Sequence, residues 1–332
     1  MTSSESLVRV LRGGIEESVH TGALALVENG ALVLSRGDPD RIVFYRSASK
    51  PLQALELVRC GAADAFGLSD AELALASGSH SAEPRHIDGA RSILRKAGVP
   101  ESALRCGGHR SVNADVAFAQ RRDAVPVTSI LSNCSGKHAG MLAAAKHRGE
   151  PLDGYMELTH PVQQAILGHV ATFAGLPRER VLAGVDGCGA PALAMPLVAM
   201  ARSIANLGAP EAMPAPLAAA AARIGAAMRT HPGMVAGEER FDTDLMLAAR
   251  GRVLAKSGAE GVHVTAIPDR RCALAVKVDD GADRGYRAVV IEVLRRLSVL
   301  ADTDADELRA RHATTVMKNM AGRPVGRLEP TF

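Results

Sequence analysis

The stretch Arg41-Ile-Val-Phe-Tyr-Arg-Ser-Ala-Ser-Lys-Pro-Leu-Gln-Ala-Leu-Glu-Leu-Val-Arg-Cys60 changes its periodicity halfway along. Residues 41–45 are predicted to form a strand and residues 51–60 a helix. A Ser-x-x-Lys element, Ser47 to Lys50, stands at this junction. Because residues i and i+3 share a helix face, the Ser47 hydroxyl and the Lys50 amine are predicted to meet. A desolvated lysine can take the proton of a serine and so make it a nucleophile.

A second lysine element adds weight to the first, since Ser-x-x-Lys alone occurs by chance in many chains. Lys256-Ser257-Gly258 lies about two hundred residues further on. Serine penicillin-recognising enzymes combine Ser-x-x-Lys with a later Lys-Thr-Gly, of which Lys-Ser-Gly is a close relative. Together the two elements indicate an enzyme with an activated serine.

Length and composition narrow the class of protein. A chain of 332 residues is long enough to bury a large core. The net charge is only +3 and the basic residues are dispersed, which argues against a nucleic-acid or membrane surface. Tryptophan is absent and Tyr and Phe are scarce, so a platform for stacking bases is not expected either.

The cysteines and the N-terminus indicate a cytoplasmic protein. Five widely spaced cysteines are an odd number, in a chain too large to need disulfide bonds for stability. The start, Met1-Thr-Ser-Ser-Glu-Ser6, has no apolar signal core. No charge-free apolar stretch is long enough to span a membrane. We therefore expect a reducing compartment and no membrane partner.

The order of patterns predicts an α+β fold. Strands are expected at residues 7–11, 23–27 and 31–34, with Asn29-Gly30 as a hairpin turn, and again at 262–267 and 272–278. Helical periods dominate between them, most clearly at 85–96, 137–147, 161–173, 192–204 and 215–228, and a last helix is expected at 286–300. We expect one domain, residues 1–332. A mostly antiparallel sheet from about 1–50 and 250–300 would be flanked by helices, with a helical subdomain at about 51–250.

Two glycine-containing stretches resemble nucleotide-binding motifs but fail as such. Gly136-Lys137 resembles the end of a phosphate-binding loop, yet position 131 is Leu and position 138 is His. Gly187-x-Gly189-x-x-Ala192 imitates a dinucleotide fingerprint, but Pro191 interrupts it and no βαβ repeat surrounds it. We expect no nucleotide site.

Six segments together resemble the bacterial type II asparaginases of the Rhizobium etli kind. They are Tyr45-Arg-Ser-Ala-Ser-Lys-Pro-Leu-Gln-Ala54, Ser77-Gly-Ser-His-Ser81, Ser132-Asn-Cys-Ser-Gly-Lys-His-Ala-Gly140, Gly184-Val-Asp-Gly-Cys-Gly-Ala-Pro191, His231-Pro-Gly-Met-Val-Ala-Gly237 and Lys256-Ser-Gly-Ala-Glu-Gly261. The resemblance extends over about residues 5–325. It implies a fold like the serine β-lactamases and serine glutaminases, hydrolysis of L-asparagine to L-aspartate and ammonia, and a homodimer.

The catalytic roles follow from the chemistry and from this resemblance. Ser47 would attack the side-chain amide carbon and Lys50 would remove its proton. Burial and the charge of Lys256 would lower the pKa of Lys50, as a base requires. The resemblance implies that Ser79 is a second catalytic serine, which would pair with Lys256 and relay a proton to the leaving ammonia.

The substrate also carries an α-carboxylate and an α-ammonium group. Arg46 can grip a carboxylate through paired donors. Asp186 is suited to the ammonium group. Asn133, Lys137 and His138 are expected to make further contacts with the substrate.

Two cysteines near these residues indicate a metal site. Spacing alone favours Cys134, His138 and Cys188, because thiolates and imidazole bind zinc well. The resemblance implies Cys134, Lys137 and Cys188 instead, with zinc beside the substrate pocket to orient groups rather than to act as the hydrolytic Lewis acid. A pair of thiols that oxidise together is the alternative explanation.

The remaining candidates are expected to be structural. His231 and Glu239 belong to a loop that resembles the family, and Glu239 is a candidate to line the site. Arg240 and Asp242 are predicted to be structural. The other cysteines lie in apolar surroundings and are predicted to be core residues: Cys60, Cys106 and Cys272.

Two alternative functions stay open. One is a related enzyme that prefers glutamine, a dipeptide or a β-lactam-like amide, since one methylene gives only about 1–3 kcal/mol of discrimination. The other is a zinc- or amino-acid-binding protein without turnover. The presence of Ser47, Lys50, Ser79 and Lys256 together argues against it, because a binding protein needs no activated nucleophile.

Overall fold

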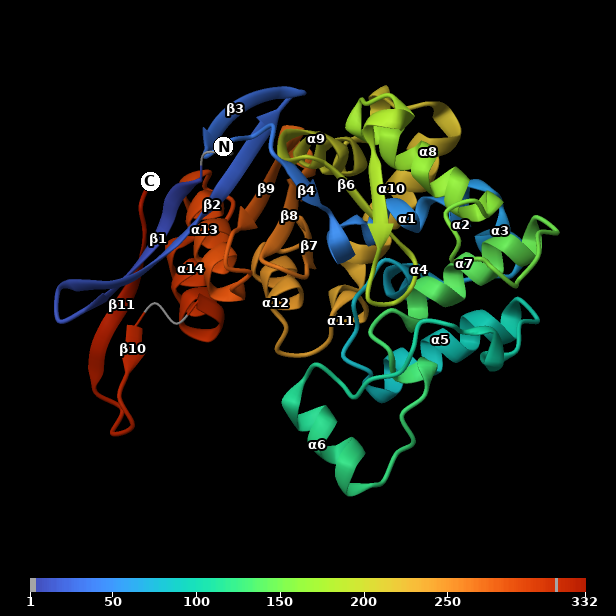
Figure 1. Cartoon of the computed structure of the whole chain (residues 1–332), viewed down its shortest axis with the longest axis horizontal. Coiled ribbons are helices and arrows are strands. Elements are labelled where there is room, and N and C mark those ends of the chain that lie inside the picture. Colours follow the sequence, from blue (N-terminus) through green and yellow to red (C-terminus); the bar gives the residue numbers. More distant parts are fainter. Residues whose placement is uncertain (1–3, 314–315) are drawn as a thin grey trace.

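The computed structural model describes residues 4–313 and 316–332, so Met1 to Ser3 of the polar N-terminal stretch lie outside it. Its main sheet has the strand order β10-β11-β1-β2-β9-β8-β7, with β3 paired to β2, and its pairings are antiparallel. The strands are β1 (Glu5–Arg12), β2 (Ile15–Glu28), β3 (Ala31–Arg36), β7 (Leu254–Gly258), β8 (Val262–Ile267), β9 (Cys272–Val278), β10 (Val316–Lys318) and β11 (Pro324–Pro330). Strands from both chain ends thus form one sheet, as predicted (Figure 1).

Both predicted hairpins are confirmed. Asn29 and Gly30 have φ values of +50° and +80°, the left-handed backbone that a two-residue turn between β2 and β3 requires. A short 3₁₀ turn, Pro268–Arg270, joins β8 to β9. The pair β10 and β11 was not predicted, since their side chains are mostly exposed and show no apolar alternation.

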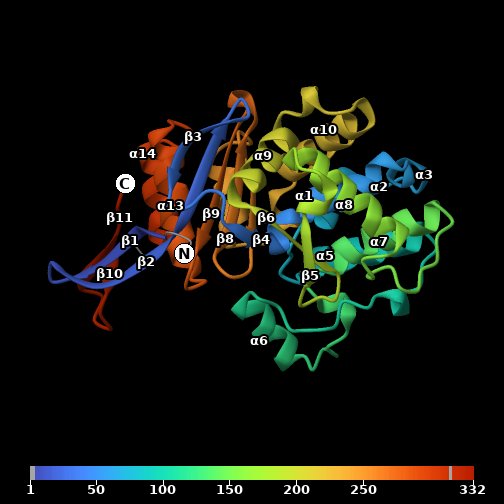
Figure 2. The same ribbon diagram turned by 45° about the horizontal axis from the view of Figure 1, so that its top comes forward.

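Helices cover both faces of the sheet centre. Nearly every position of β8 and β9 is buried, which requires packing on both sides. Helix α9 (Leu197–Gly208) packs on β2, β8 and β9, and α13 (Asp283–Arg296) packs on β1, β8, β9 and β11. The last helix, α14 (Asp302–Leu308), lies beside α13 (Figures 1 and 2).

The middle of the chain forms a group of helices on the side of the sheet away from β10 and β11 (Figure 2). They are α1 (Lys50–Gln53), α2 (Leu55–Arg59), α3 (Ala62–Ala65), α4 (Asp70–Ala76), α5 (Pro84–Lys96), α6 (Ala114–Arg122), α7 (Ser135–His147), α8 (Pro161–Ala174), α10 (Ala215–Thr230), α11 (Pro232–Val235) and α12 (Phe241–Ala248). The helices expected at 85–96, 137–147, 161–173 and 215–228 are confirmed. One large apolar cluster includes residues from the sheet and from these helices. The assignment of residues 1–332 to a single domain stays a prediction.

A second, small sheet corrects part of the prediction. Strands β4 (Ile42–Phe44), β5 (Leu182–Val185) and β6 (Pro191–Pro196) pair in the order β4-β6-β5. The helix expected over 192–204 therefore begins only at Leu197, because its first residues form β6. Prolines at both ends of β6 lack the N–H that a helix interior would use, whereas an extended segment tolerates them. All six side chains of β6 are buried, so its apolar run showed no alternation.

The segment after β4 also differs from the continuous helix expected over 51–60. A 3₁₀ helix, Arg46–Ser49, precedes α1, and Ala54 separates α1 from α2. Ser47 and Lys50 still share one turn, because the Lys50 N–H donates a hydrogen bond to the Ser47 carbonyl. Within the described residues, none of the helices has both the length and the apolar character needed to cross a membrane.

Candidate active site

Ser47 lies on a strained turn between the small sheet and α1. Arg46, just before it, has φ +51°, a left-handed conformation that an arginine seldom adopts. Such strain persists only where the surrounding structure imposes it, and it is frequent at active sites. Ser47 is partly exposed, whereas Ala48, Ser49 and Lys50 are buried. Of the four residues of the Ser-x-x-Lys element, Ser47 is thus the one that is not buried.

Strand β7 approaches this turn through a glycine. A Cβ atom on Gly258 would lie 2.9 Å from the Tyr45 carbonyl oxygen and 3.3 Å from the Ala48 nitrogen. A side chain at position 258 would therefore push β7 away from the turn. Gly258 lets the Lys256-Ser257-Gly258 strand, from the far end of the sequence, lie against the segment that carries Ser47.

Ser79 follows α4 and is fixed by its backbone. Its N–H donates a 2.7 Å hydrogen bond to the Val235 carbonyl. The preceding Gly78 permits this approach, since a Cβ atom there would lie 2.5 Å from the same oxygen. Ser79 is thereby held between α4 and the end of α11.

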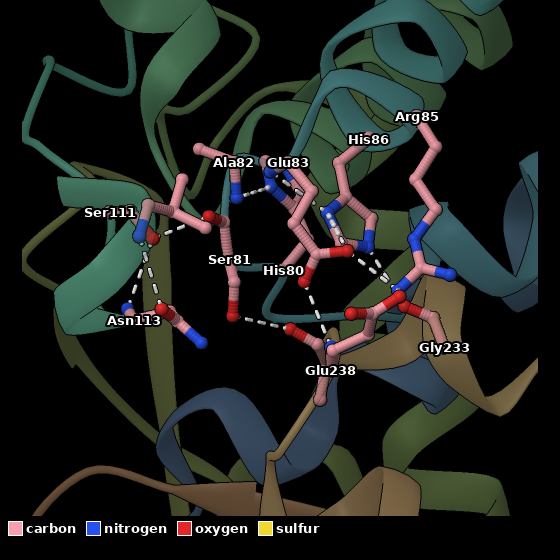
Figure 3. Close-up of polar contacts among 12 residues, drawn as sticks. His80, Ser81, Ala82, Glu83, Arg85, His86, Ser111, Asn113, Gly233 and Glu238 are labelled. Atoms are coloured by element: carbon pink, nitrogen blue, oxygen red, sulfur yellow. Dashed lines mark hydrogen bonds and ion pairs between the residues drawn. The ribbon is translucent and has the colours of Figure 1, made fainter. Parts of the chain in front are cut away.

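Further contacts join the residues after Ser79 to the loop that follows α11 (Figure 3). The Ser81 hydroxyl donates to the Ala236 carbonyl at 2.8 Å. The carboxylate of Glu83, at the start of α5, accepts a 2.8 Å hydrogen bond from the Glu238 N–H. Arg85 forms ion pairs with Glu83 at 2.6 Å and with Glu238 at 3.6 Å. These bonds from both sides keep the Ser79 segment in place.

Lys50 contacts the second serine rather than the first. Its Nζ donates a 2.8 Å hydrogen bond to Ser79 Oγ and a 3.3 Å one to the Asn133 carbonyl. The sequence predicted that Lys50 meets Ser47 and that Ser79 pairs with Lys256, so the observed partner of each differs. The 3₁₀ turn keeps Ser47 and Lys50 on one face, so the backbone does not explain the first difference. The Lys50 side chain turns instead to Ser79 and to the Asn133 carbonyl.

Lys256, in β7, is fully buried, and its amine contacts one backbone carbonyl and one carboxylate. Its Nζ donates to the Ser257 carbonyl at 2.7 Å and lies 3.6 Å from Asp242 Oδ2. Burial lowers the pKa of Lys256 to about 8, although the Asp242 carboxylate opposes the shift; the charge of Lys50 adds to it. A substantial share of Lys256 is therefore neutral in mildly alkaline solution.

An ion pair joins Arg46 to Asp186. These are the two residues that were expected to bind the α-carboxylate and the α-ammonium group of the substrate. The distances from Asp186 Oδ1 are 3.1 Å to Arg46 Nε and 3.0 Å to Nη2. Both side chains are partly exposed, at 26% for Arg46 and 14% for Asp186. This arrangement presents one cationic and one anionic group side by side, next to Ser47.

The other three expected substrate contacts lie around the same place but are engaged with the protein. The Asn133 carbonyl accepts from Lys50 and from the His80 N–H. Lys137 Nζ donates to Cys188 Sγ at 3.1 Å. His138 Nδ1 lies 2.7 Å from the Tyr155 hydroxyl, and its buried Nε2 has no hydrogen-bond partner among the described residues.

The thiols gather beside Lys137. Cys106, Cys134 and Cys188 form one small buried cluster with Ala190, and all five cysteines are free. The hydrogen bond from Cys188, with help from the charges of Lys50 and Lys137, holds the pKa of Cys134 well below its usual range. The same bond and burial raise the pKa of Cys188.

The donors present fit zinc in kind. Two sulfurs and one amine are soft or borderline ligands, and tetrahedral zinc with three protein ligands keeps one open position. Over residues 4–313 and 316–332, however, no group of three His, Cys, Asp or Glu side chains is arranged to hold a metal. A site here would therefore need Lys137, whose pKa is raised by the two thiols against the effect of burial, so that a metal must displace its proton.

Sequence reasoning placed the main residues of the site together but missed several supporting ones. Asp242 was expected to be structural, yet it pairs with Lys256. Tyr155 and His109, which bond His138 and Asn133, were not singled out at all. No local pattern marks them, since each acts on a residue far away in the chain. Of the cysteines predicted to be core residues, Cys106 and Cys272 are buried but Cys60 is only half-buried.

Comparisons with known proteins agree with the sequence motifs. The family described as L-asparaginase II matches residues 8–330. No curated protein sequence gives a significant match. Among solved structures, a β-lactamase from Mycobacterium bovis aligns with 12% identity and a TM-score of 0.40, over 87% of this chain and 94% of the other.

Two other solved structures align at similar levels. A β-lactamase from Sulfitobacter sp. EE-36 has 15% identity and a TM-score of 0.41, with 82% and 92% of the two chains covered. A protein titled Mglu has 19% identity and a TM-score of 0.36, with 89% and 70% covered. The assignment to a family rests on the L-asparaginase II match, which includes every site residue discussed above.

We expect Gly258→Ala to lower the free energy of unfolding by about 1–3 kcal/mol, because the new methyl group has to displace backbone atoms of the Ser47 turn. Urea unfolding followed by circular dichroism measures the change. Gly168→Ala is a matched control, since a Cβ atom there has free space inside α8. Alanine should stabilise that helix by about 0.5–1 kcal/mol. A Gly258→Ala protein as stable as wild type would contradict the tight contact between β7 and the turn.

Proposed function

We propose that this chain, which belongs to the L-asparaginase II family, hydrolyses L-asparagine to L-aspartate and ammonia with Ser47 as nucleophile. Membership of the family makes the chain an asparaginase-type amidohydrolase with a small-molecule substrate. The observation that carries the proposal is the hydrogen bond from the buried Lys50 amine to Ser79, three residues after the partly exposed Ser47. A binding protein would have no use for a buried amine that is hydrogen-bonded to a serine.

In the proposed first step, Ser47 Oγ attacks the side-chain amide carbon and Lys50 takes its proton. The carbon–oxygen bond to Ser47 forms as the carbonyl becomes an oxyanion, and backbone donors, including the Ser47 N–H, stabilise it. The proton then passes from Lys50 through Ser79 to the amide nitrogen. The carbon–nitrogen bond breaks, ammonia leaves, and an ester on Ser47 remains. This route uses the observed Lys50–Ser79 contact in place of a direct Ser79–Lys256 contact.

In the second step, water hydrolyses the ester. Lys50 removes a proton from the water, the tetrahedral intermediate collapses, and Ser47 recovers its proton as aspartate is released. Lys256 contributes as a cation near Lys50, which stabilises negative charge that develops on the substrate. The reaction needs no oxidant and no group from outside except water.

Substrate binding would open the ion pair between Arg46 and Asp186. The α-carboxylate would replace Asp186 on Arg46, and the α-ammonium group would replace Arg46 on Asp186. The two new ion pairs would compensate for the one that is lost, so a zwitterionic amino acid fits this pair better than a neutral amide does.

We also propose that Cys134, Lys137 and Cys188 hold zinc, as the family resemblance implies. The kind of donors and the contact of Lys137 with Cys188 support it. When bound, the metal would supply a fixed positive charge beside the substrate pocket and orient its ligands. The hydrolytic steps above use only protein groups. The homodimer and the cytoplasmic location stay predictions.

We expect Ser47→Ala to release no more than a few per cent of the ammonia that wild type releases from L-asparagine. L-glutamine is assayed in parallel, so a preference for the longer amide would show at once. The mutant should keep its circular dichroism spectrum. The control is Ser77→Ala, whose hydroxyl bonds the Leu73 carbonyl and takes no part in the reaction. Ammonia release that persists in Ser47→Ala would rule out Ser47 as nucleophile, and release from neither amide by wild type would favour a binding protein.

We expect Asp186→Ala to raise KM for L-asparagine about tenfold or more and to change kcat much less, because a charge-assisted hydrogen bond to the ammonium group is lost. Steady-state ammonia release measures both constants. Asp123→Ala is the control, since Asp123 forms an exposed ion pair with its neighbour Arg122. A fall in kcat with KM unchanged would instead place Asp186 in the chemical step.

We expect protein purified without chelator to contain zinc by elemental analysis, and the Cys188→Ser variant to contain much less. Removal of the metal by a chelator should leave the fold intact, because the surrounding helices pack against one another through apolar side chains. Zinc-free wild-type protein would contradict the metal site. A disulfide between Cys134 and Cys188, found by mass spectrometry of the unreduced protein, would support the alternative of a thiol pair.

A further inference from the structure

Asp242 is a buried carboxylate that the steps above do not use. It is the second residue of α12 and is only 2% exposed. Its Oδ2 accepts two 2.8 Å hydrogen bonds from Ser257, one from the backbone N–H and one from the hydroxyl. The same oxygen lies 3.6 Å from Lys256 Nζ. One carboxylate oxygen thus contacts both residues at the centre of β7.

The second oxygen of Asp242 is anchored on the neighbouring strand. Oδ1 lies 3.2 Å from His263 Nε2, and His263 is paired with Ser257 across the β7–β8 ladder. The other ring nitrogen, Nδ1, is 3.2 Å from Thr265 Oγ1, and the ring stacks on Tyr286. With its partner ring held in this way, the carboxylate has little freedom to move.

These contacts matter because β7 ends the order of the main sheet. The outward N–H groups of such a strand have no neighbouring strand to bond. Asp242 takes the place of that neighbour for Ser257, the residue after Lys256. It therefore fixes the backbone from which the Lys256 side chain projects.

The charges around Lys256 give Asp242 a second role. The positive groups that face the Lys256 amine are Lys50 on α1 and Arg240 just before α12, and the negative groups are Asp242 and Cys134. Burial by itself would raise the pKa of Asp242, but the charge of Lys256 and the contact with His263 lower it far below its usual range. Asp242 is therefore a carboxylate throughout the working pH range, and it favours the charged form of Lys256.

We propose that Asp242 is a positioning residue for Lys256: it ties β7 to α12 and His263, and it keeps the Lys256 ammonium group charged and in place beside Lys50. The proposal rests on the proposed function for its effect on turnover, since Asp242 acts on the substrate only through Lys256. It assigns a role in the reaction to a residue that the sequence marked only as structural.

The test is Asp242→Asn, which removes the charge and keeps the shape. The asparagine oxygen can still accept both bonds from Ser257. Its NH₂ group can donate to His263 Nε2 when the ring proton sits on Nδ1 and points to Thr265. The matched control is Asp244→Asn, two residues further along α12. The Asp244 carboxylate binds His312 at 2.8 Å and Arg311 at 3.1 Å instead of Lys256.

For Asp242→Asn we expect kcat to fall about tenfold or more while KM changes little, because general acid–base and electrostatic terms act in the chemical step. The charged fraction of Lys256 falls as pH rises through its pKa of about 8. Loss of the Asp242 charge lowers that pKa further. The alkaline limb of the kcat–pH profile should therefore move to lower pH in Asp242→Asn and stay in place in Asp244→Asn.

A second readout does not depend on turnover. In protein with ¹⁵N-labelled lysine, the Lys256 Nζ signal should titrate at lower pH in Asp242→Asn than in wild type. If wild type does not hydrolyse the amide but this shift occurs, the proposed function fails and the link between Asp242 and Lys256 stands. If wild type is active and Asp242→Asn keeps its kcat, its alkaline limb and the Lys256 titration, the positioning role is wrong.

Hydrogen exchange of the wild-type protein covers the case in which Asp242→Asn does not fold. The Ser257 amide belongs to an edge strand, so it should exchange quickly unless Asp242 accepts its hydrogen bond. Strong protection of this amide supports the bridge from α12 to β7. Exchange as fast as that of an open strand edge would overturn the proposal.

Discussion

The burial of three lysine amines around one point is the constraint on which the site depends. Lys50, Lys137 and Lys256 are only 1%, 4% and 1% exposed. Buried charges lower the stability of a protein unless opposite charges or hydrogen bonds compensate. Here the compensation comes from Asp242 beside Lys256 and from the thiol pair of Cys134 and Cys188 beside Lys137. Lysine amines that carry a charge here can stabilise an oxyanion intermediate.

The same positive field determines what the nearby histidines can do. Burial, together with the surrounding positive charges, lowers the pKa of His80 and of His138 well below the usual value. Both rings are therefore neutral at physiological pH and serve as hydrogen-bond partners, His80 of Ser135 and His138 of Tyr155. A neutral imidazole whose pKa is so low is a weak base. Among these groups, lysine is therefore the better candidate for the proposed proton transfer.

The sequence predicted the fold class and the members of the site because both leave local patterns. Strand alternation and the Asn29-Gly30 turn marked the sheet, and short motifs marked Ser47, Ser79 and Lys256. The pairing of Lys50 with Ser79 could not be predicted, since Ser79 is held in place by its backbone bond to Val235, far away in the chain. The small sheet was missed because β6 is buried on both faces and its apolar run resembles a helix. Long-range partners have no signature in the neighbouring sequence.

The ion pair of Arg46 and Asp186 also bears on the choice between asparagine and glutamine. An amino acid held by its carboxylate and its ammonium group has a fixed Cα position, so the length of its side chain decides where the amide carbon lies. Arg46 is the residue directly before Ser47, so the proposed carboxylate site and the proposed nucleophile are neighbours in the chain. In the proposed binding mode, one extra methylene would move the amide carbon relative to the Ser47 hydroxyl. Discrimination by such a mismatch amounts to about 1–3 kcal/mol, so selectivity for asparagine should be partial rather than absolute.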